Sequence, residues 1–114
     1  MLHVLFVCSR NQWRSPTAER LFWKMPGLQV RSAGLSRSAR RRLTDDDLGW
    51  ADVVMVMEDH HADRIRQHFR DAVRGLNIEV LDIPDDYVFM DPQLCALLED
   101  TVPPLLDVYT EGGS

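Results

Sequence analysis

Four short segments of the chain have the pattern of β-strands: residues 2–7, 28–32, 52–57 and 78–83. Residues 2–7 and 52–57 are almost wholly apolar, with little alternation between apolar and polar positions. Such runs are typical of strands that are buried on both faces of a sheet.

Segments with helical periodicity alternate with these strands. Pro16 suits the first turn of a helix, and Thr44, with three aspartates after it, suits an N-cap. The segment 35–42 is polar and basic, and we predict a loop or a frayed helix there. The predicted helices cover residues 16–25, about 45–50, 59–73 and 93–109, and Pro103-Pro104 is expected to kink or split the last one.

Alternating strands and helices predict a parallel sheet with right-handed crossovers. In such sheets the ligand site lies at the carboxyl ends of the strands. Cys8 and Asp85 both follow predicted strands, so we expect both at that edge.

Composition narrows the class of protein. The chain has 114 residues, 45% of them apolar, and a net charge of −5, which makes nucleic-acid binding unexpected. Two cysteines are too few for a disulfide framework, which favours a reducing, cytoplasmic location. We see no signal peptide and no membrane span. The basic run Arg37–Arg42 fits a solvated face, or a surface that receives an acidic or multiply phosphorylated substrate.

The most informative feature is a thiol at the end of the first strand. Cys8 is followed by five residues and then by Arg14, at the start of a predicted helix. A helix N-terminus and a guanidinium favour a thiolate, and loop N–H groups with Arg14 can bind a tetrahedral dianion. Ser15 can donate its hydroxyl to the sulfur. The reaction would also need a carboxylic acid to protonate a leaving group, and the candidates are Asp82, Asp85, Asp86 and Asp91. Cys8 as a buried structural thiol is the alternative.

Residues 7–19, V-C-S-R-N-Q-W-R-S-P-T-A-E, resemble the phosphate loop of low-molecular-weight protein tyrosine phosphatases, V-C-x-G-N-x-C-R-S-P-x-A-E. The resemblance extends to Ser32-Ala33-Gly34 and to residues 52–57, a strand that ends in Met before an acidic residue. The chain departs from the family at Arg10, where Gly is usual, and at Trp13, where Cys is common. It is also shorter than the family between Gly34 and Asp52.

The pattern and the resemblance together predict one α/β domain over residues 1–114. We expect three layers, with helices on both faces of a four-stranded parallel sheet in the order 2-1-3-4. The resemblance implies a two-step hydrolysis in which Cys8 attacks phosphorus, Arg14 stabilises the transferred group and Asp85 is the general acid, with Asp82 and Asp91 as alternatives. It implies no cofactor and no metal. The residues expected to bind substrate are Ser9, Arg10, Asn11, Gln12, Trp13 and Ser15, with Tyr87 as an aromatic wall.

Two other functions remain open on the sequence. An arsenate reductase shares this loop and fold, but it needs a second thiol within reach, and Cys95 is the only other cysteine. A non-catalytic phosphate-binding module would explain Arg10 and the absence of an Asp-Pro pair at residue 85. The expected partner is a phosphorylated protein or a small phosphomonoester, with no membrane partner, and the oligomeric state is left open. His60-His61 lacks the ligand pattern of a zinc site.

Overall fold

The sheet has four parallel strands in the order β2-β1-β3-β4. The computed structural model describes residues 1–110. Its strands are β1 (Leu2–Cys8), β2 (Leu28–Gly34), β3 (Val53–Val56) and β4 (Asn77–Val80). The predicted parallel sheet and strand order are confirmed, and the two most apolar strands, β1 and β3, lie at its centre. Both faces of these two strands are covered, as continuous apolar runs require.

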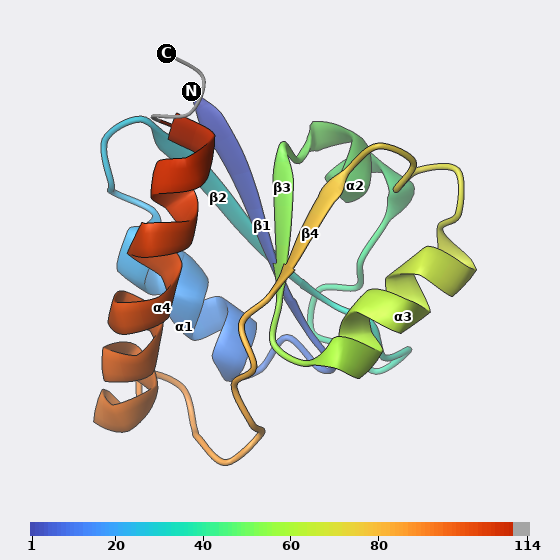
Figure 1. Cartoon of the computed structure of the whole chain (residues 1–114). Helices are drawn as coiled ribbons and strands as arrows, with labels where there is room; N and C mark the ends of the chain where they lie inside the picture. Colours follow the sequence, from blue (N-terminus) through green and yellow to red (C-terminus); the bar gives the residue numbers. More distant parts are fainter. Residues whose placement is uncertain (111–114) are drawn as a thin grey trace.

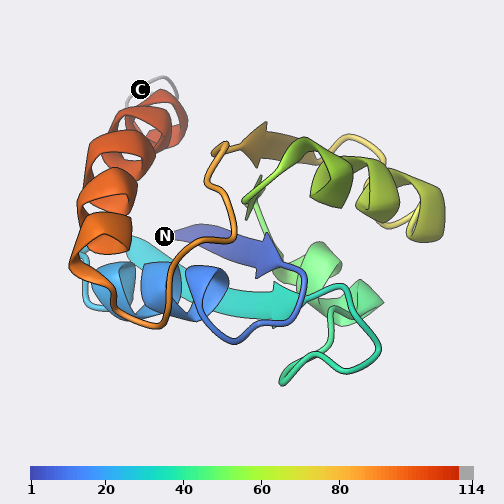
Figure 2. The ribbon, with the colours of Figure 1, turned by 90° about the horizontal axis from the view of Figure 1, so that it is seen from below.

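Helices cover both faces of the sheet, so the predicted three layers are confirmed (Figure 1). The helices α1 (Arg14–Phe22) and α4 (Pro92–Thr110) lie on one face, and α2 (Asp45–Trp50) and α3 (Asp59–His68) lie on the other. The view from below shows α1 and α4 side by side (Figure 2). No helix within residues 1–110 is long and apolar enough to cross a membrane.

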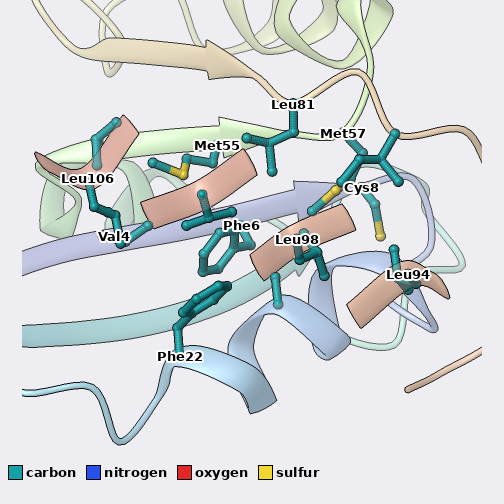
Figure 3. Close-up of a cluster of buried hydrophobic side chains, with 14 of the residues drawn as sticks. Val4, Phe6, Cys8, Phe22, Met55, Met57, Leu81, Leu94, Leu98 and Leu106 are labelled. Carbon is teal, nitrogen blue, oxygen red and sulfur yellow. The ribbon is translucent and has the colours of Figure 1, made fainter. Parts of the chain in front are cut away.

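Alternate residues of β1 contribute to two hydrophobic clusters, one on each face of the sheet. Val4, Phe6 and Cys8 belong to the cluster under α1 and α4, where the rings of Phe6 and Phe22 stack at 6.0 Å between centroids (Figure 3). Leu5 and Val7 belong to the other cluster. The two-residue period of a strand therefore places the Cys8 side chain on the α1/α4 face.

The fourth strand is shorter than the predicted 78–83. Regular pairing ends at Val80, although the amides of Leu81 and Ile83 still donate to β3 and its extension at 2.8 Å. Asp82 lies between them with a left-handed φ of 58°, which breaks the regular ladder. The chain leaves the sheet here and carries Asp85 toward the end of β1.

The helix predicted over 59–73 ends at His68 in the structure. Phe69 leaves the helix (φ −129°, ψ 43°), and turns follow as far as Gly75, whose φ is 77°. Phe69 and Val73 still pack against the second cluster. Phe69 and Val73 have the four-residue spacing of a helix face because both pack against the second cluster from successive turns of the chain.

The prolines at 103 and 104 do not divide α4, which runs unbroken over 19 residues. Leu98, Val102 and Leu106 are buried at four-residue intervals on both sides of the prolines. Burial of this face outweighs the hydrogen bonds that proline cannot donate.

Candidate active site

The loop between β1 and α1 is folded around the side chain of Asn11. Asn11 has a left-handed φ of 54° and is fully buried. Its amide nitrogen donates to the hydroxyls of Ser15 and Ser32, each at 2.9 Å. The Asn11 side chain ties the loop to α1 and β2, and the expected role of Asn11 in binding substrate stays a prediction. Left-handed backbone is more accessible to Asn than to most residues.

The segment after β2 supports this loop from outside. The carbonyls of Ser9 and Arg10 accept hydrogen bonds from the amides of Ser36 (2.8 Å) and Arg40 (3.0 Å), and the Arg40 Nε donates to the Asn11 carbonyl at 3.1 Å. A trans peptide directs its C=O and N–H in opposite directions. Because three successive carbonyls face outward, we expect the N–H groups of residues 10–12 to face the opposite side of the loop, toward the pocket.

Gly34 allows this close approach. A Cβ at Gly34 would lie 2.6 Å from the Ala39 Cβ, 2.7 Å from the Ser9 carbonyl oxygen and 2.9 Å from the Asn11 nitrogen. Real Cβ atoms essentially never come so close to other atoms. The Ser-Ala-Gly motif is thus placed directly behind the loop.

Cys8 lies at the bottom of a pocket of about 230 Å³ and is only 3% exposed. Its Sγ is 3.0 Å from the Ser15 Oγ, the contact expected from the sequence. The structure brings together most of the predicted site residues here, and the pocket is lined by Cys8, Ser9, Arg10, Gln12, Trp13, Arg14 and Asp85.

The guanidinium of Arg14 is buried and fixed from one side. Its Nη1 donates to the Glu58 carboxylate and, at 2.8 Å, to the Ile83 carbonyl. Its Nε lies 3.6 Å from an Asp85 carboxylate oxygen. With both Nη1 hydrogens occupied, Nη2 and Nε remain for a ligand in the pocket. These two nitrogens present the parallel donors that bind an oxyanion in a bidentate manner.

Glu58 is a site residue that sequence reasoning missed. The hydrogen bond from Arg14 lowers the pKa of Glu58, against the opposing effect of burial. The carboxylate therefore stays ionised beside the guanidinium. Its place in the sequence could have indicated this role. Glu58 is the acidic residue after Met57 that belongs to the resemblance, and it follows β3, which lies next to β1.

His61 connects this acid to the loop. Its Nδ1 accepts a hydrogen bond from the Glu58 amide at 3.1 Å, so its Nε2 carries the proton and donates to the Ser9 hydroxyl at 2.9 Å. Burial, followed by the charges of His60 and Arg14, lowers the pKa of His61 to about 4. The ring is therefore neutral near pH 7. Glu58, His60 and His61 lie within 4.8 Å of one another, but both His61 nitrogens already have partners, so the cluster does not suit a metal.

Of the candidate general acids, Asp85 is the one that lines the pocket. Its carboxylate is 58% exposed at the pocket mouth. Asp91 instead accepts a hydrogen bond from the Gln93 amide at 2.8 Å near the start of α4, and Asp82 and Asp86 do not line the pocket. The geometry favours Asp85, and its role stays a prediction.

Tyr87, expected to bind substrate, and Cys95, the possible second thiol of a reductase, do not line the pocket. Tyr87 is half-buried against the hydrophobic cluster under α1 and α4 and does not line the pocket, where Trp13 is the aromatic residue. Cys95 lies on α4, also outside the pocket lining, and both cysteines are free.

No family model matches the sequence, and no curated protein sequence matches it. Solved structures do match. The YwlE arginine phosphatase from Geobacillus stearothermophilus is 23% identical, with 98% of this chain and 92% of that chain covered and a TM-score of 0.71. The low-molecular-weight protein tyrosine phosphatase SP-PTP from Streptococcus pyogenes is 16% identical, with coverages of 94% and 92% and a TM-score of 0.78.

A third structure, the tyrosine phosphatase AmsI from Erwinia amylovora, is 26% identical, with coverages of 95% and 93% and a TM-score of 0.74. These likenesses extend over nearly the whole length of each chain, and the strand order is the predicted one. The chain has the fold of the low-molecular-weight protein tyrosine phosphatases, the family that residues 7–19 resemble.

Proposed function

We propose that the protein is a cysteine-dependent phosphatase that hydrolyses phosphotyrosine-like monoesters through a phosphocysteine intermediate. The observation that carries this proposal is the position of Cys8 in its pocket. Its sulfur lies 3.0 Å from the Ser15 hydroxyl, at the bottom of a small pocket that Arg14 and Asp85 also line. The relatives of known structure, described as tyrosine or arginine phosphatases, support phosphatase activity.

In the first step the Cys8 thiolate attacks phosphorus in line with the leaving oxygen. The P–O bond breaks as the S–P bond forms, and Asp85 gives its proton to the departing phenolate. The loop N–H groups and the Nη2 and Nε of Arg14 stabilise the equatorial oxygens of the transferred group.

In the second step water attacks the phosphocysteine. Asp85, now a carboxylate, takes a proton from the water, and the S–P bond breaks to release phosphate. The Ser15 hydroxyl, 3.0 Å from the sulfur, stabilises the thiolate as it leaves. Positive charge comes from Arg14 and from backbone dipoles, so the proposed reaction uses no metal and no cofactor.

Phosphoarginine is the second candidate substrate. One similar structure is described as an arginine phosphatase. The half-exposed Asp85 side chain would pair with the guanidinium of phosphoarginine as a carboxylate, whereas it would protonate a phenolate as the neutral acid. Parallel rates on an aryl phosphate and on a phosphoarginine peptide decide between the two classes.

The central experiment measures hydrolysis of an aryl phosphate by the wild type, Cys8→Ser, Asp85→Asn and Asp86→Asn. We expect vanadate-sensitive turnover, no activity in Cys8→Ser, and a kcat about 10²–10⁴-fold lower in Asp85→Asn, because general-acid catalysis has this magnitude. Asp86 is the matched control, since it neighbours Asp85 but does not line the pocket. Equal rates for the wild type and Cys8→Ser would exclude the mechanism.

The same preparation tests the two other functions. Arsenate-dependent oxidation of thiols would indicate a reductase, although Cys95 lies outside the pocket lining. Saturable phosphate binding without turnover of any phosphomonoester or phosphoarginine peptide would indicate a binding module.

The remaining expectations belong to this proposal. The substrate is a phosphorylated protein or a small phosphomonoester, nucleic acid and membranes are not partners, and the protein acts in the cytoplasm, where thiols such as Cys8 stay reduced. That the chain forms a single domain is likewise proposed.

A further inference from the structure

A second pocket of about 390 Å³ lies between α3 and the segment 35–43. Arg37 and Arg42 line it from the segment, and Arg64 and His68 line it from α3. Its other lining residues are apolar: Leu35, Leu43 and Phe69. In a protein with a net charge of −5, this pocket has no carboxylate in its lining.

The cationic groups of this pocket are uncompensated within the described residues. Arg14, Arg31, Arg41, Arg66 and Arg74 each lie within 4.0 Å of a carboxylate. In residues 1–110, neither the three arginines of the pocket nor His68 makes such a pair. Asp45 and Asp71 contribute to a neighbouring hollow that shares His68 and Phe69, but not to this pocket. Like charges converging around one cavity repel one another, and a bound anion relieves that repulsion.

The backbone that carries these side chains is fixed. Gly34 and Arg42 form a parallel bridge, with hydrogen bonds of 2.8 Å from the Gly34 amide to the Arg41 carbonyl and from the Leu43 amide to the Gly34 carbonyl. On α3, Arg64 and His68 are four residues apart and share a face, while the buried Ile65 anchors the helix. Because these backbone positions are set before a ligand binds, only the side chains lose freedom on binding.

The pocket adjoins the proposed active site. The segment 35–43 also supports the phosphate loop, since Ser36 and Arg40 donate to the carbonyls of Ser9 and Arg10. Figure 2 shows this segment beside the loop, at the carboxyl end of the sheet. Arg64 is near enough to His61, the partner of Ser9, to be among the charges acting on it.

We propose that Arg37, Arg42, Arg64 and His68 form a second binding site for a phosphate group, separate from the pocket of Cys8. Arginine donors match the geometry of phosphate oxygens better than a single point charge does. The phosphate group can come from free phosphate in solution or from a second phosphorylated position on the substrate. The second source rests on the proposed function, and the first does not.

The binding test uses inorganic phosphate as the probe. Nuclear magnetic resonance spectra of the wild type, recorded at constant ionic strength, should show two saturable sets of shifts. One set is in the amides of residues 9–14, and the other is in the arginine side chains of residues 37, 42 and 64. In the double variant Arg42→Gln/Arg64→Gln only the Arg37 signal of the second set remains, and its shift should require at least about tenfold more phosphate, as expected for loss of charged hydrogen bonds, while the first set is unchanged.

The control variant is Arg66→Gln, which removes an exposed charge from the same helix and does not alter the pocket lining. Absence of saturable shifts at residues 37, 42 and 64 in the wild type would overturn the proposal. So would equal weakening by Arg66→Gln, which would mean general charge attraction, or equal affinity for succinate, which would mean no preference for phosphate. Unchanged amide shifts of residues 9–14 in the double variant establish that the fold is intact.

Kinetics distinguish the two sources of the phosphate group. If the substrate supplies it, the double variant raises KM for a doubly phosphorylated peptide by about tenfold or more and leaves KM for an aryl monophosphate unchanged. If solution supplies it, both KM values are unchanged and the binding result alone supports the site. An inactive wild type would refute the proposed function but would not affect the binding test.

Discussion

At the residue scale, the candidate site depends on how Arg14 is held. One nitrogen of its guanidinium is bound by Glu58 and the Ile83 carbonyl, which leaves the other two nitrogens available to the pocket. Cys8 also has a defined partner, because its sulfur lies 3.0 Å from the Ser15 hydroxyl. Fixed donors need not reorganise as charge develops on the transferred group, which is the main requirement for electrostatic catalysis.

This arrangement predicts that Glu58→Gln lowers kcat about tenfold or more, with a smaller change in KM. The variant removes the ionic partner of Arg14, and charged hydrogen bonds contribute about 1.5–3 kcal/mol. Steady-state kinetics with an aryl phosphate provide the measurement. Asp59→Asn is the control, since it removes the next acidic residue, which is exposed at the start of α3. Similar kcat values for Glu58→Gln and the wild type would show that Arg14 is positioned without Glu58.

At the scale of the elements, the phosphate loop is shaped by β2 and the segment that follows it. The loop contributes the chemistry, but its carbonyls are fixed by residues 36 and 40, and its close packing requires Gly34. The loop is therefore as dependent on the end of β2 as on its own residues.

We accordingly expect Gly34→Ala to reduce activity and to lower the free energy of unfolding by about 1–3 kcal/mol, as overpacking does. The added Cβ would meet backbone atoms at 2.7 and 2.9 Å, so the loop must shift. Urea unfolding and kinetics measure the two effects. Gly49→Ala is the matched control, because nothing lies within 4 Å of its Cβ, and an alanine within α2 should raise stability by about 0.5–1 kcal/mol. Full activity in Gly34→Ala would show that the loop does not depend on this approach.

For the whole molecule, three groups make the folded state sensitive to acid. Burial lowers the pKa of His61 to about 4, so the unfolded chain gains a proton near pH 6.5 while the folded chain does not. The pKa of Asp47 is raised by burial but lowered more by hydrogen bonds from Arg41 and the Thr44 amide, so its net shift is downward. The pKa of Glu58 is also lowered. All three shifts destabilise the folded state at low pH, because protons bind the unfolded chain more readily than the folded chain.

The free energy of unfolding should therefore fall as the pH drops below about 6.5. His61 accounts for the fall down to pH 4, on the order of 3 kcal/mol, and the contributions of Asp47 and Glu58 are lost at lower pH still. Urea unfolding at a series of pH values measures it. His61→Gln should flatten the curve between pH 6.5 and 4. A wild-type stability that is constant from pH 7 to 5 would contradict this account.

Much of the fold could be predicted from local patterns. The apolar runs of β1 and β3, the N-cap at Thr44 and the proline in the first turn of α1 all depend on neighbours in sequence, and the structure confirms each element. The predictions that were wrong concern helices whose extent is set by contacts with residues far away in the sequence. The end of α3 at His68 and the continuity of α4 through Pro103 depend on what the second and first clusters bury.

The sequence by itself determined the alternation of strands and helices, the thiol at the end of the first strand and the loop that follows it. Hydrophobic periodicity, helix capping and turn preferences depend on residues close together in the sequence. They can therefore be recognised within a single segment of the chain. Only the tertiary structure decided that Asp85 lines the pocket, that Glu58 holds Arg14, and that His61 is neutral beside Ser9. Each of these depends on side chains from segments that follow separate strands and meet at one sheet edge, and their charges are set by burial and by partners far away in the sequence.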